Sequence, residues 1–381
     1  MKKILSVIVV VVVTLTQTAQ ITAFAQETDK PAVNAQACVL YCVDDGKMYF
    51  SVNENKKMKP ASTTKLMTSL ITLEYADSAD KVVDFTKDMT AEGSSMYLKV
   101  GEKVKLSDLA AGMMMASGND AANAAAISIA GSAEKFSELM NNRAAVIGMK
   151  NTHFVTPSGL DDENHYSTAY DMALLMSYAL ENESFAKLTS QKSVTVEFSE
   201  PQSKRTTYTN HNRLLSMYEY CTGGKTGYTM AAGRCLVSSA KKDGLTFVCV
   251  TLNDRNDWND HIALYNYGFS KLACVECDDS DYYLEIPCAG GDDESIGVTG
   301  TKGKNVVVPL DKKSNVVRTA YADNFLYAPV KDGDIVGRIE YTLDGKTLAS
   351  TNLTAVEYSN TQNKNKSFWT KIKDFFTYGK E

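Results

Sequence analysis

Two hairpin patterns on either side of a helical segment constrain the fold of this chain more than any other feature of its sequence. Residues 37–51 and 234–252 each contain two apolar runs joined by a turn that ends in Asp-Gly or Asp-Asp-Gly. Between them, residues 107–130 are dense in Ala, Leu and Met, and residues 170–181 are amphipathic, as in packed helices. We therefore expect an α+β domain, with an antiparallel sheet built from both ends of the domain and a helical cluster inserted between its strands.

Ser62 and Lys65 stand at the start of an expected helix, because the apolar residues that follow recur at helical spacing. Residues three apart lie one turn apart on one helix face, so the two side chains are within reach of each other. The partial positive charge of a helix N-terminus favours an ionised serine oxygen and opposes a protonated lysine. A neutral Lys65 is then able to accept the Ser62 proton. Taken alone, however, Ser-x-x-Lys is far more typical of a helix N-cap followed by an exposed lysine.

Two further segments decide between these interpretations. Ser117-Gly118-Asn119 falls at an interruption between two helical pieces, and Lys225-Thr226-Gly227 falls on or just before a strand. Ser-x-x-Lys, Ser-x-Asn and Lys-Thr-Gly in this order are the signature of penicillin-recognising serine enzymes. With the segments 156–160, 165–171 and 231–233, they resemble the serine-type D-alanyl-D-alanine carboxypeptidases, which are low-molecular-mass penicillin-binding proteins. The resemblance extends from about residue 33 to 272, and more loosely to about 357.

The resemblance implies a β-lactamase/transpeptidase-like catalytic domain and a hydrolase that removes the terminal D-alanine from peptidoglycan stem peptides, thereby limiting cross-linking of the cell wall. Ser62 is then the nucleophile that carries the acyl group, and Lys65 is the general base. Ser117 would relay a proton, and Asn119 would bind an amide of the substrate. Penicillins and other β-lactams are expected to acylate Ser62. The resemblance implies no cofactor, and no ligand spacing in the sequence indicates a metal site.

The substrate-binding strand is expected at Lys225, Thr226 and Gly227. Their cationic and hydroxyl donors suit the terminal carboxylate of the substrate, and the backbone N–H groups of Ser62 and Tyr228 match the oxyanion hole of the family. Arg255 is our candidate for a further, bidentate contact with that carboxylate. The alternative for Arg255 is a surface residue paired with a neighbouring aspartate.

Two other functions and one other catalytic mechanism compete with this interpretation. A β-lactamase would need a carboxylate that activates the deacylating water, and the acidic cluster at 161–163 lies in a stretch that resembles the carboxypeptidases instead. A non-catalytic protein that binds peptidoglycan or senses β-lactams would need a defect in one of the three segments, and all three are intact. A Ser-His-Asp triad would need one of four histidines, none of which accompanies a Gly-x-Ser-x-Gly segment, so all four are interpreted as non-catalytic.

The domain organisation follows from changes in composition along the chain. Residues 1–25 read as a secretory signal peptide with an Ala-x-Ala cleavage site, and residues 26–275 as the catalytic domain. Short β-rich runs over 276–358 indicate a small β-sandwich. Residues 359–381 form a polar linker followed by an amphipathic helix. We therefore expect an exported protein at the outer face of the cytoplasmic membrane or in the cell wall.

The C-terminal segment is expected to bind a membrane surface through residues 366–378. Its aromatic and apolar residues fall on one helical stripe, and the segment is rich in lysine although the whole chain has a net charge of −6. The alternative is a helix docked on the protein's own core. Nothing in the body of the chain indicates nucleic-acid binding, because no basic stripe interleaved with aromatic residues occurs there.

The eight cysteines leave the redox state of the chain open. Several lie in apolar runs, where a free thiol packs as a small hydrophobe. Cys274 and Cys277 have the spacing of half a zinc site, but no second pair completes it, so a structural role is favoured.

Overall fold

A five-stranded antiparallel sheet forms the centre of the catalytic region in the computed structural model, which describes residues 30–290 and 294–356. In spatial order its strands are β2 (Lys47–Val52), β1 (Ala37–Cys42), β9 (Leu245–Leu252), β8 (Gly233–Lys242) and β7 (Cys221–Thr229). The expected assembly of one sheet from both ends of the domain is thus confirmed. Because β7 lies at the end of this order, one of its edges has no strand partner among the described residues.

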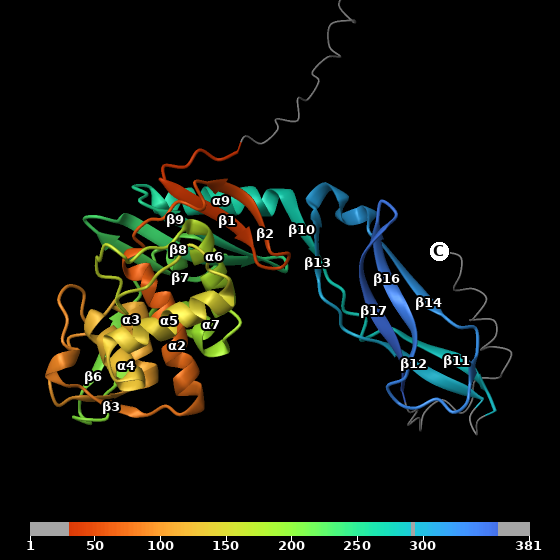
Figure 1. Cartoon of the computed structure of the whole chain (residues 1–381). Helices are drawn as coiled ribbons and strands as arrows, with labels where there is room; N and C mark the ends of the chain where they lie inside the picture. Colours follow the sequence, from red (N-terminus) through yellow and green to blue (C-terminus); the bar gives the residue numbers. More distant parts are fainter. Residues whose placement is uncertain (1–29, 291–293, 357–381) are drawn as a thin grey trace, which may run out of the picture.

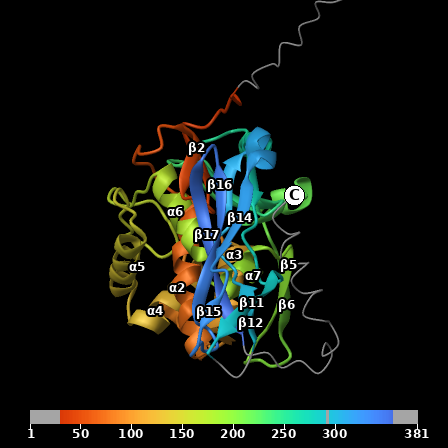
Figure 2. The same ribbon diagram turned by 90° about the vertical axis from the view of Figure 1, so that its right-hand side faces the viewer.

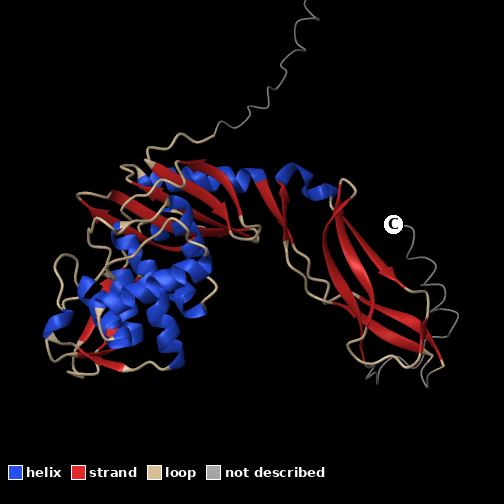
Figure 3. Ribbon diagram, in the orientation of Figure 1, coloured by secondary structure: helices blue, strands red, loops and turns tan. Residues whose placement is uncertain are grey.

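Helices cover both faces of this sheet, with α9 on one face and the helical cluster on the other (Figures 1 and 3). The helices are α2 (Lys65–Ser78), α3 (Leu106–Met115), α4 (Asn119–Ala130), α5 (Ala133–Ile147), α6 (Ala169–Ala179), α7 (Glu183–Thr189), α8 (Leu214–Met217) and α9 (Asp257–Lys271), with 3₁₀ turns η1 (Ala61–Thr64), η2 (Lys87–Met89) and η3 (Leu310–Asn315). Two small hairpins, β3 (Val82–Asp84) with β4 (Lys103–Lys105) and β5 (Ser193–Glu197) with β6 (Arg205–Thr209), extend the cluster.

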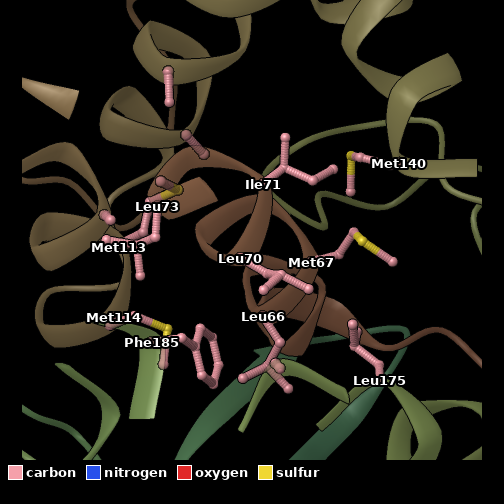
Figure 4. Close-up of a cluster of buried hydrophobic side chains, with 14 of the residues drawn as sticks. Leu66, Met67, Leu70, Ile71, Leu73, Met113, Met114, Met140, Leu175 and Phe185 are labelled. Atoms are coloured by element: carbon pink, nitrogen blue, oxygen red, sulfur yellow. The ribbon is translucent and has the colours of Figure 1, made fainter. Parts of the chain in front are cut away.

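The core of the cluster is packed around α2, which carries ten buried residues in fourteen. Figure 4 shows Leu66, Leu70 and Ile71 of this helix surrounded by side chains from other helices, including Met113 and Phe185. Burial on nearly all sides fixes the rotation and height of α2, and burying each of its larger aliphatic side chains contributes about 1.5–3 kcal/mol. The start of α2 is therefore held in a defined position beneath β7.

The break between α3 and α4 coincides with Ser117-Gly118, as expected. Ser117 has a left-handed backbone conformation, with φ of 57°. The N–H of Gly118 donates to the carbonyl of Gly112, and Asn119 begins the new helix. This turn points the side chain of Ser117 out of the helical cluster toward the sheet.

The C-terminal region is β-rich, as expected. Its strands are β11 (Tyr283–Ala289), β12 (Ser295–Gly300), β14 (Val317–Ala322), β15 (Leu326–Tyr327), β16 (Ile335–Leu343) and β17 (Lys346–Val356). Hydrogen bonds join all six in one sheet of order β14-β16-β17-β12-β11-β15, while β10 (Leu272–Val275) pairs separately with β13 (Val306–Pro309). Figure 2 shows β14, β16 and β17 side by side in this region. It has a small core of its own, which includes Ile286, Val298 and Leu353.

The expected signal peptide and the C-terminal amphipathic helix lie outside the described residues. Within 30–290 and 294–356, no helix is long and apolar enough to cross a bilayer.

Candidate active site

Ser62 lies in the 3₁₀ turn η1, immediately before α2 and against strand β7. A Cβ atom added to Gly227 would lie 3.0 Å from both the carbonyl oxygen of Pro60 and the backbone nitrogen of Ser62. Glycine at 227 therefore permits the close approach of β7 to the turn. On the other side of the turn, a Cβ added to Gly159 would lie 2.0 Å from the carbonyl oxygen of Ala61. The turn is thus held between two glycines from distant parts of the chain.

The amine of Lys65 lies among three oxygen atoms. Its Nζ is 3.1 Å from Ser62 Oγ, 2.7 Å from Asn119 Oδ1 and 2.6 Å from the carbonyl oxygen of Ser158. The side chain is fully buried. Burial lowers the pKa of Lys65 well below its ordinary value of 10.5, the positive charge of Lys225 lowers it further, and Asp120 opposes both effects.

The two carbonyl oxygens beside Lys65 are acceptors only, whereas the Ser62 hydroxyl both donates and accepts. A neutral amine has two hydrogens and one lone pair. If the hydrogens are donated to Asn119 and Ser158, the lone pair faces the Ser62 hydroxyl. The geometry and the lowered pKa of Lys65 thus agree: the site favours an amine that accepts the Ser62 proton.

Ser117 and Lys225 form a second pair on the other side of the same site. Lys225 Nζ donates to Ser117 Oγ at 3.0 Å and to the carbonyl oxygen of Thr226 at 2.8 Å. Both side chains are nearly fully buried. Burial lowers the pKa of Lys225 from 10.5 to about 7, so this amine exchanges its proton near neutral pH.

The loop before α3 is fixed over the site by Asp120, a buried residue of the first turn of α4. Its carboxylate accepts hydrogen bonds from Ser95 Oγ and from the backbone N–H groups of Met96 and Leu98. The carbonyl of Ser94 in turn accepts from the N–H of Asn119. These bonds place Ser94 and Asn119 on the border of the site.

His165 positions the loop that carries the Ser158 carbonyl. Its Nδ1 accepts from the backbone N–H groups of Val155 and Thr156, at 3.1 and 3.2 Å, and its Nε2 lies 2.9 Å from Thr64 Oγ1. Because Nδ1 accepts, Nε2 carries the hydrogen and donates to Thr64. Burial lowers the pKa of His165 to about 4, so the ring is neutral. The sequence-based interpretation of this histidine as structural agrees with these contacts.

A cavity of about 520 Å³ opens beside Ser62. Of the predicted residues, Ser62, Ser117, Thr226, Gly227 and Tyr228 line it. Lys65 donates to Ser62 and to Asn119, and Lys225 donates to Ser117, so these three side chains adjoin the cavity. The structure therefore brings together eight of the nine predicted site residues.

Arg255 is the exception: it is exposed and is absent from the cavity wall. The arginine in the wall is Arg234, accompanied by Trp258 and Asp257 from the start of α9. His211 also lines the cavity, and no motif in the sequence predicts its position there. The signal for Arg234 is its register, because it stands directly opposite Tyr228 in the β7–β8 pair.

Comparisons with known proteins agree for both regions. Residues 24–256 match the family described as D-alanyl-D-alanine carboxypeptidase, peptidase S11, and residues 278–358 match the C-terminal domain of penicillin-binding protein 5. The chain is 32% identical to a D-alanyl-D-alanine carboxypeptidase of Bacillus subtilis over 94% of both chains. It is 33% identical to one of Escherichia coli, covering 88% of this chain and 87% of that protein. Penicillin-binding protein 5 of Haemophilus influenzae superposes with a TM-score of 0.65 at 29% identity, over 86% of this chain and 98% of that one.

Proposed function

This chain belongs to the peptidase S11 family of D-alanyl-D-alanine carboxypeptidases, and from that premise we propose how its own residues carry out the reaction. The enzyme is a serine carboxypeptidase that releases the terminal D-alanine of peptidoglycan stem peptides and binds penicillin. Ser62 is the nucleophile and Lys65 is its general base. The observation that carries this assignment is the buried Lys65 amine, 3.1 Å from Ser62 Oγ, with two carbonyl oxygens occupying its hydrogens.

In the acylation step, Ser62 Oγ attacks the carbonyl carbon between the two D-alanines while its proton passes to Lys65 Nζ. The developing oxyanion is stabilised by the backbone N–H groups of Ser62 and Tyr228. In support, the backbone nitrogen of Ser62 lies close to Gly227, the residue that precedes Tyr228 in β7. Removing one such donor from an oxyanion hole typically costs a factor of 10² to 10³ in kcat.

The leaving amine of D-alanine needs a proton, and the pair Ser117–Lys225 supplies it. The Ser117 hydroxyl passes its proton to the amine and takes one from Lys225, whose pKa of about 7 suits this transfer near neutral pH. Lys65 then loses its proton to solvent and Lys225 regains one, so both lysines return to their starting states. Water attacks the acyl-enzyme while its proton passes to Lys65, and Lys65 returns that proton to Ser62 Oγ as the ester bond breaks and the shortened peptide leaves.

The substrate backbone binds along the free edge of β7. An extended peptide pairs with the exposed edge of a sheet through main-chain hydrogen bonds. Such pairing carries the scissile carbonyl past Gly227 and over Ser62, with the hydroxyl of Thr226 facing the cavity. Asn119, fixed through its Oδ1 by Lys65 and through its Nδ2 by the carbonyl of Glu92, borders the opposite wall.

Neither a β-lactamase nor a non-catalytic protein that binds peptidoglycan or senses β-lactams is supported by the comparisons. In the acidic cluster that a β-lactamase would need, the carboxylate of Asp161 already has other partners. It accepts a hydrogen bond from Thr229 and lies 3.8 Å from the amine of Lys59. Both interactions tie the 161–163 loop to its surroundings, outside the cavity wall.

The assignment is tested by D-alanine release from a synthetic peptide that ends in Lys-D-Ala-D-Ala. We expect release by the wild-type protein and none by Ser62→Ala. Ser78→Ala, which removes an exposed hydroxyl at the far end of the same helix, is the matched control and should match the wild type. Release by Ser62→Ala at the wild-type rate would refute the nucleophile, and no release by folded wild-type protein would refute the activity.

We further propose that the protein is exported and binds a membrane surface. Action on cell-wall peptidoglycan requires an exported protein, and we assign residues 1–25 as its signal peptide, 26–275 as the catalytic domain and 276–358 as the β-rich domain. Residues 366–378 bind the membrane surface through their aromatic stripe and lysines. Sedimentation with anionic vesicles should require these residues and weaken at high salt; equal binding by a chain that ends at 358 would contradict it.

A further inference from the structure

Two aromatic side chains are exposed at one end of the β-rich region. Phe325 and Tyr327 flank Leu326 at strand β15, and Leu326 is buried in the core of this region. Because successive side chains of a strand point to opposite faces, the two aromatic rings point away from that core. The exposed fraction is 49% for Phe325 and 71% for Tyr327, and their ring centres lie 5.1 Å apart in an edge-to-face contact. An apolar surface of two packed rings thus faces the solvent.

The strand register places these rings at the end of the sheet from which the C-terminal residues continue. In β12, Gly297 pairs with both Val356 of β17 and Glu285 of β11. Since both strands are antiparallel to β12, β11 runs parallel to β17, and it continues to Ala289, which pairs with Tyr327. At about 3.3 Å per residue, the four residues from Glu285 to Ala289 place Tyr327 roughly 13 Å beyond the level of Val356, in the direction in which β17 ends. Figure 1 shows β11 and β12 at the end of this region that is remote from β10 and β13.

Only a short stretch of chain separates this end from the segment proposed to bind the membrane. Residues 357–365 lie between Val356 and the segment 366–378. A chain spans at most about 3.6 Å per residue, so Val356 lies within roughly 35 Å of that segment. A second contact made from this end of the sheet is therefore intramolecular. Even a weak contact then strengthens binding, because its effective concentration is high.

We propose that Phe325 and Tyr327, together with the exposed Ile335 at the same end of the sheet, enter the interfacial layer of the membrane as a second contact beside residues 366–378. This inference rests on the membrane binding proposed above for that segment. Aromatic side chains favour the boundary between headgroups and acyl chains, and tyrosine keeps its hydroxyl in the polar layer. Two contacts fix the orientation of the β-rich region on the membrane, which a single contact does not.

Charge distinguishes this contact from the lysine-rich segment. The exposed side chains beside the rings include the carboxylates of Asp323 and Asp334, which an anionic surface does not attract. Binding through the rings comes instead from the apolar surface that they remove from water. Its contribution should therefore persist at high salt, whereas salt screens the contribution of the lysines.

The experiment measures the partition of the full chain onto vesicles of mixed neutral and anionic phospholipids, at low and at high salt. We expect Phe325→Ala/Tyr327→Ala to lower the partition coefficient at least tenfold at both salt concentrations. Leu310→Ala/Val317→Ala is the matched control, because it removes two exposed apolar side chains at the opposite end of the same region, and it should bind like the wild type. D-alanine release from a soluble peptide should be equal in both variants and the wild type, which shows that each is folded.

Two single variants locate the contact directly. Phe325→Trp and Val317→Trp each add one tryptophan to the two of the wild type. Bromine atoms on the acyl chains of the lipid quench only tryptophans that lie close to them. On vesicles of such lipid, we expect Phe325→Trp to lose a larger fraction of its fluorescence than Val317→Trp.

Several results would overturn the inference. They are vesicle binding by the aromatic double variant that equals that of the wild type, an equal loss of binding in both double variants, and equal quenching of the two tryptophan variants. A loss of binding to isolated cell walls with vesicle binding intact would assign the rings to glycan and would also overturn it. Failure of the proposed membrane segment looks different, because the wild type would then not sediment with vesicles.

Discussion

Replacing Asp254 by asparagine should stabilise the protein above neutral pH. Asp254 follows strand β9 and is fully buried. Its Oδ1 accepts from the N–H of Asn256, whereas its Oδ2 is one of the few buried side-chain oxygens with no partner among the described residues. Burial, followed by the nearby carboxylates of Asp260 and Asp257, raises the pKa of Asp254 from 3.8 to about 6. A proton on this carboxyl also supplies the missing hydrogen bond between Asp254 and Asp260.

The sign of the effect follows from the raised pKa. The folded protein holds the Asp254 proton more tightly than the unfolded chain does, so the stabilisation is complete below pH 3.8 and is lost as the pH rises through about 6. A rise of the pKa from 3.8 to about 6 corresponds to about 3 kcal/mol of unfolding free energy. Asparagine keeps the Oδ1 acceptor and carries an N–H donor at the position of Oδ2, so Asp254→Asn should regain most of that amount at pH 8 and almost none at pH 4.

Urea denaturation of both proteins at pH 4, 6 and 8 measures this difference, with the wild type as reference at each pH. Asp243→Asn, an exposed substitution in the β8–β9 turn, is the control and should leave the free energy of unfolding unchanged at each pH. An Asp254→Asn variant that is less stable than the wild type at pH 8, or that differs by the same amount at every pH, would refute the reasoning.

Three further predictions concern the site. Gly227→Ala should lower kcat at least tenfold with little change in KM, because its Cβ would press on the backbone nitrogens of Ser62 and Thr63. Steady-state kinetics measure this effect, and a variant with the wild-type kcat would contradict it. His165→Gln should lower both kcat and the melting temperature, since one side chain cannot reproduce the two accepted N–H bonds and the donation to Thr64; an unchanged kcat would speak against its positioning role. For the wild type, kcat/KM should fall above pH 7 by up to tenfold per pH unit, because Lys225 loses its proton there. The variant Lys225→Arg should move that fall to higher pH. An identical pH profile in both proteins would exclude Lys225 as the titrating group.

The elements with strong local signals were predictable from sequence. The hairpins 37–51 and 234–252 contain turn residues between apolar runs, and the structure confirms both as β1–β2 and β8–β9. The interruption at Ser117-Gly118 was visible because a serine and a glycine break an apolar helical pattern. The β-rich region after residue 276 was likewise visible from its turns, although the sequence did not show that all six strands form one sheet.

The parts that sequence reasoning missed depend on contacts between distant segments. The Ser158 carbonyl that binds Lys65 lies 93 residues further along the chain, and backbone acceptors leave no mark on a side-chain pattern. The positions of Arg234 and Arg255 likewise depend on contacts between segments. The register of β7 on β8 places Arg234 opposite Tyr228 and in the cavity wall, whereas Arg255 lies outside that wall. The sequence does not predict the hairpin β5–β6, because its two five-residue strands each contain only one buried residue.

Trapping the acyl-enzyme tests the central claim most directly. Wild-type protein is incubated with benzylpenicillin, digested, and examined by mass spectrometry, in parallel with Ser62→Ala and Ser78→Ala. We predict one covalent adduct on the peptide that contains Ser62, present in the wild type and Ser78→Ala and absent from Ser62→Ala. An adduct on any other residue, or one that persists in Ser62→Ala, would contradict the assignment of Ser62 as the nucleophile.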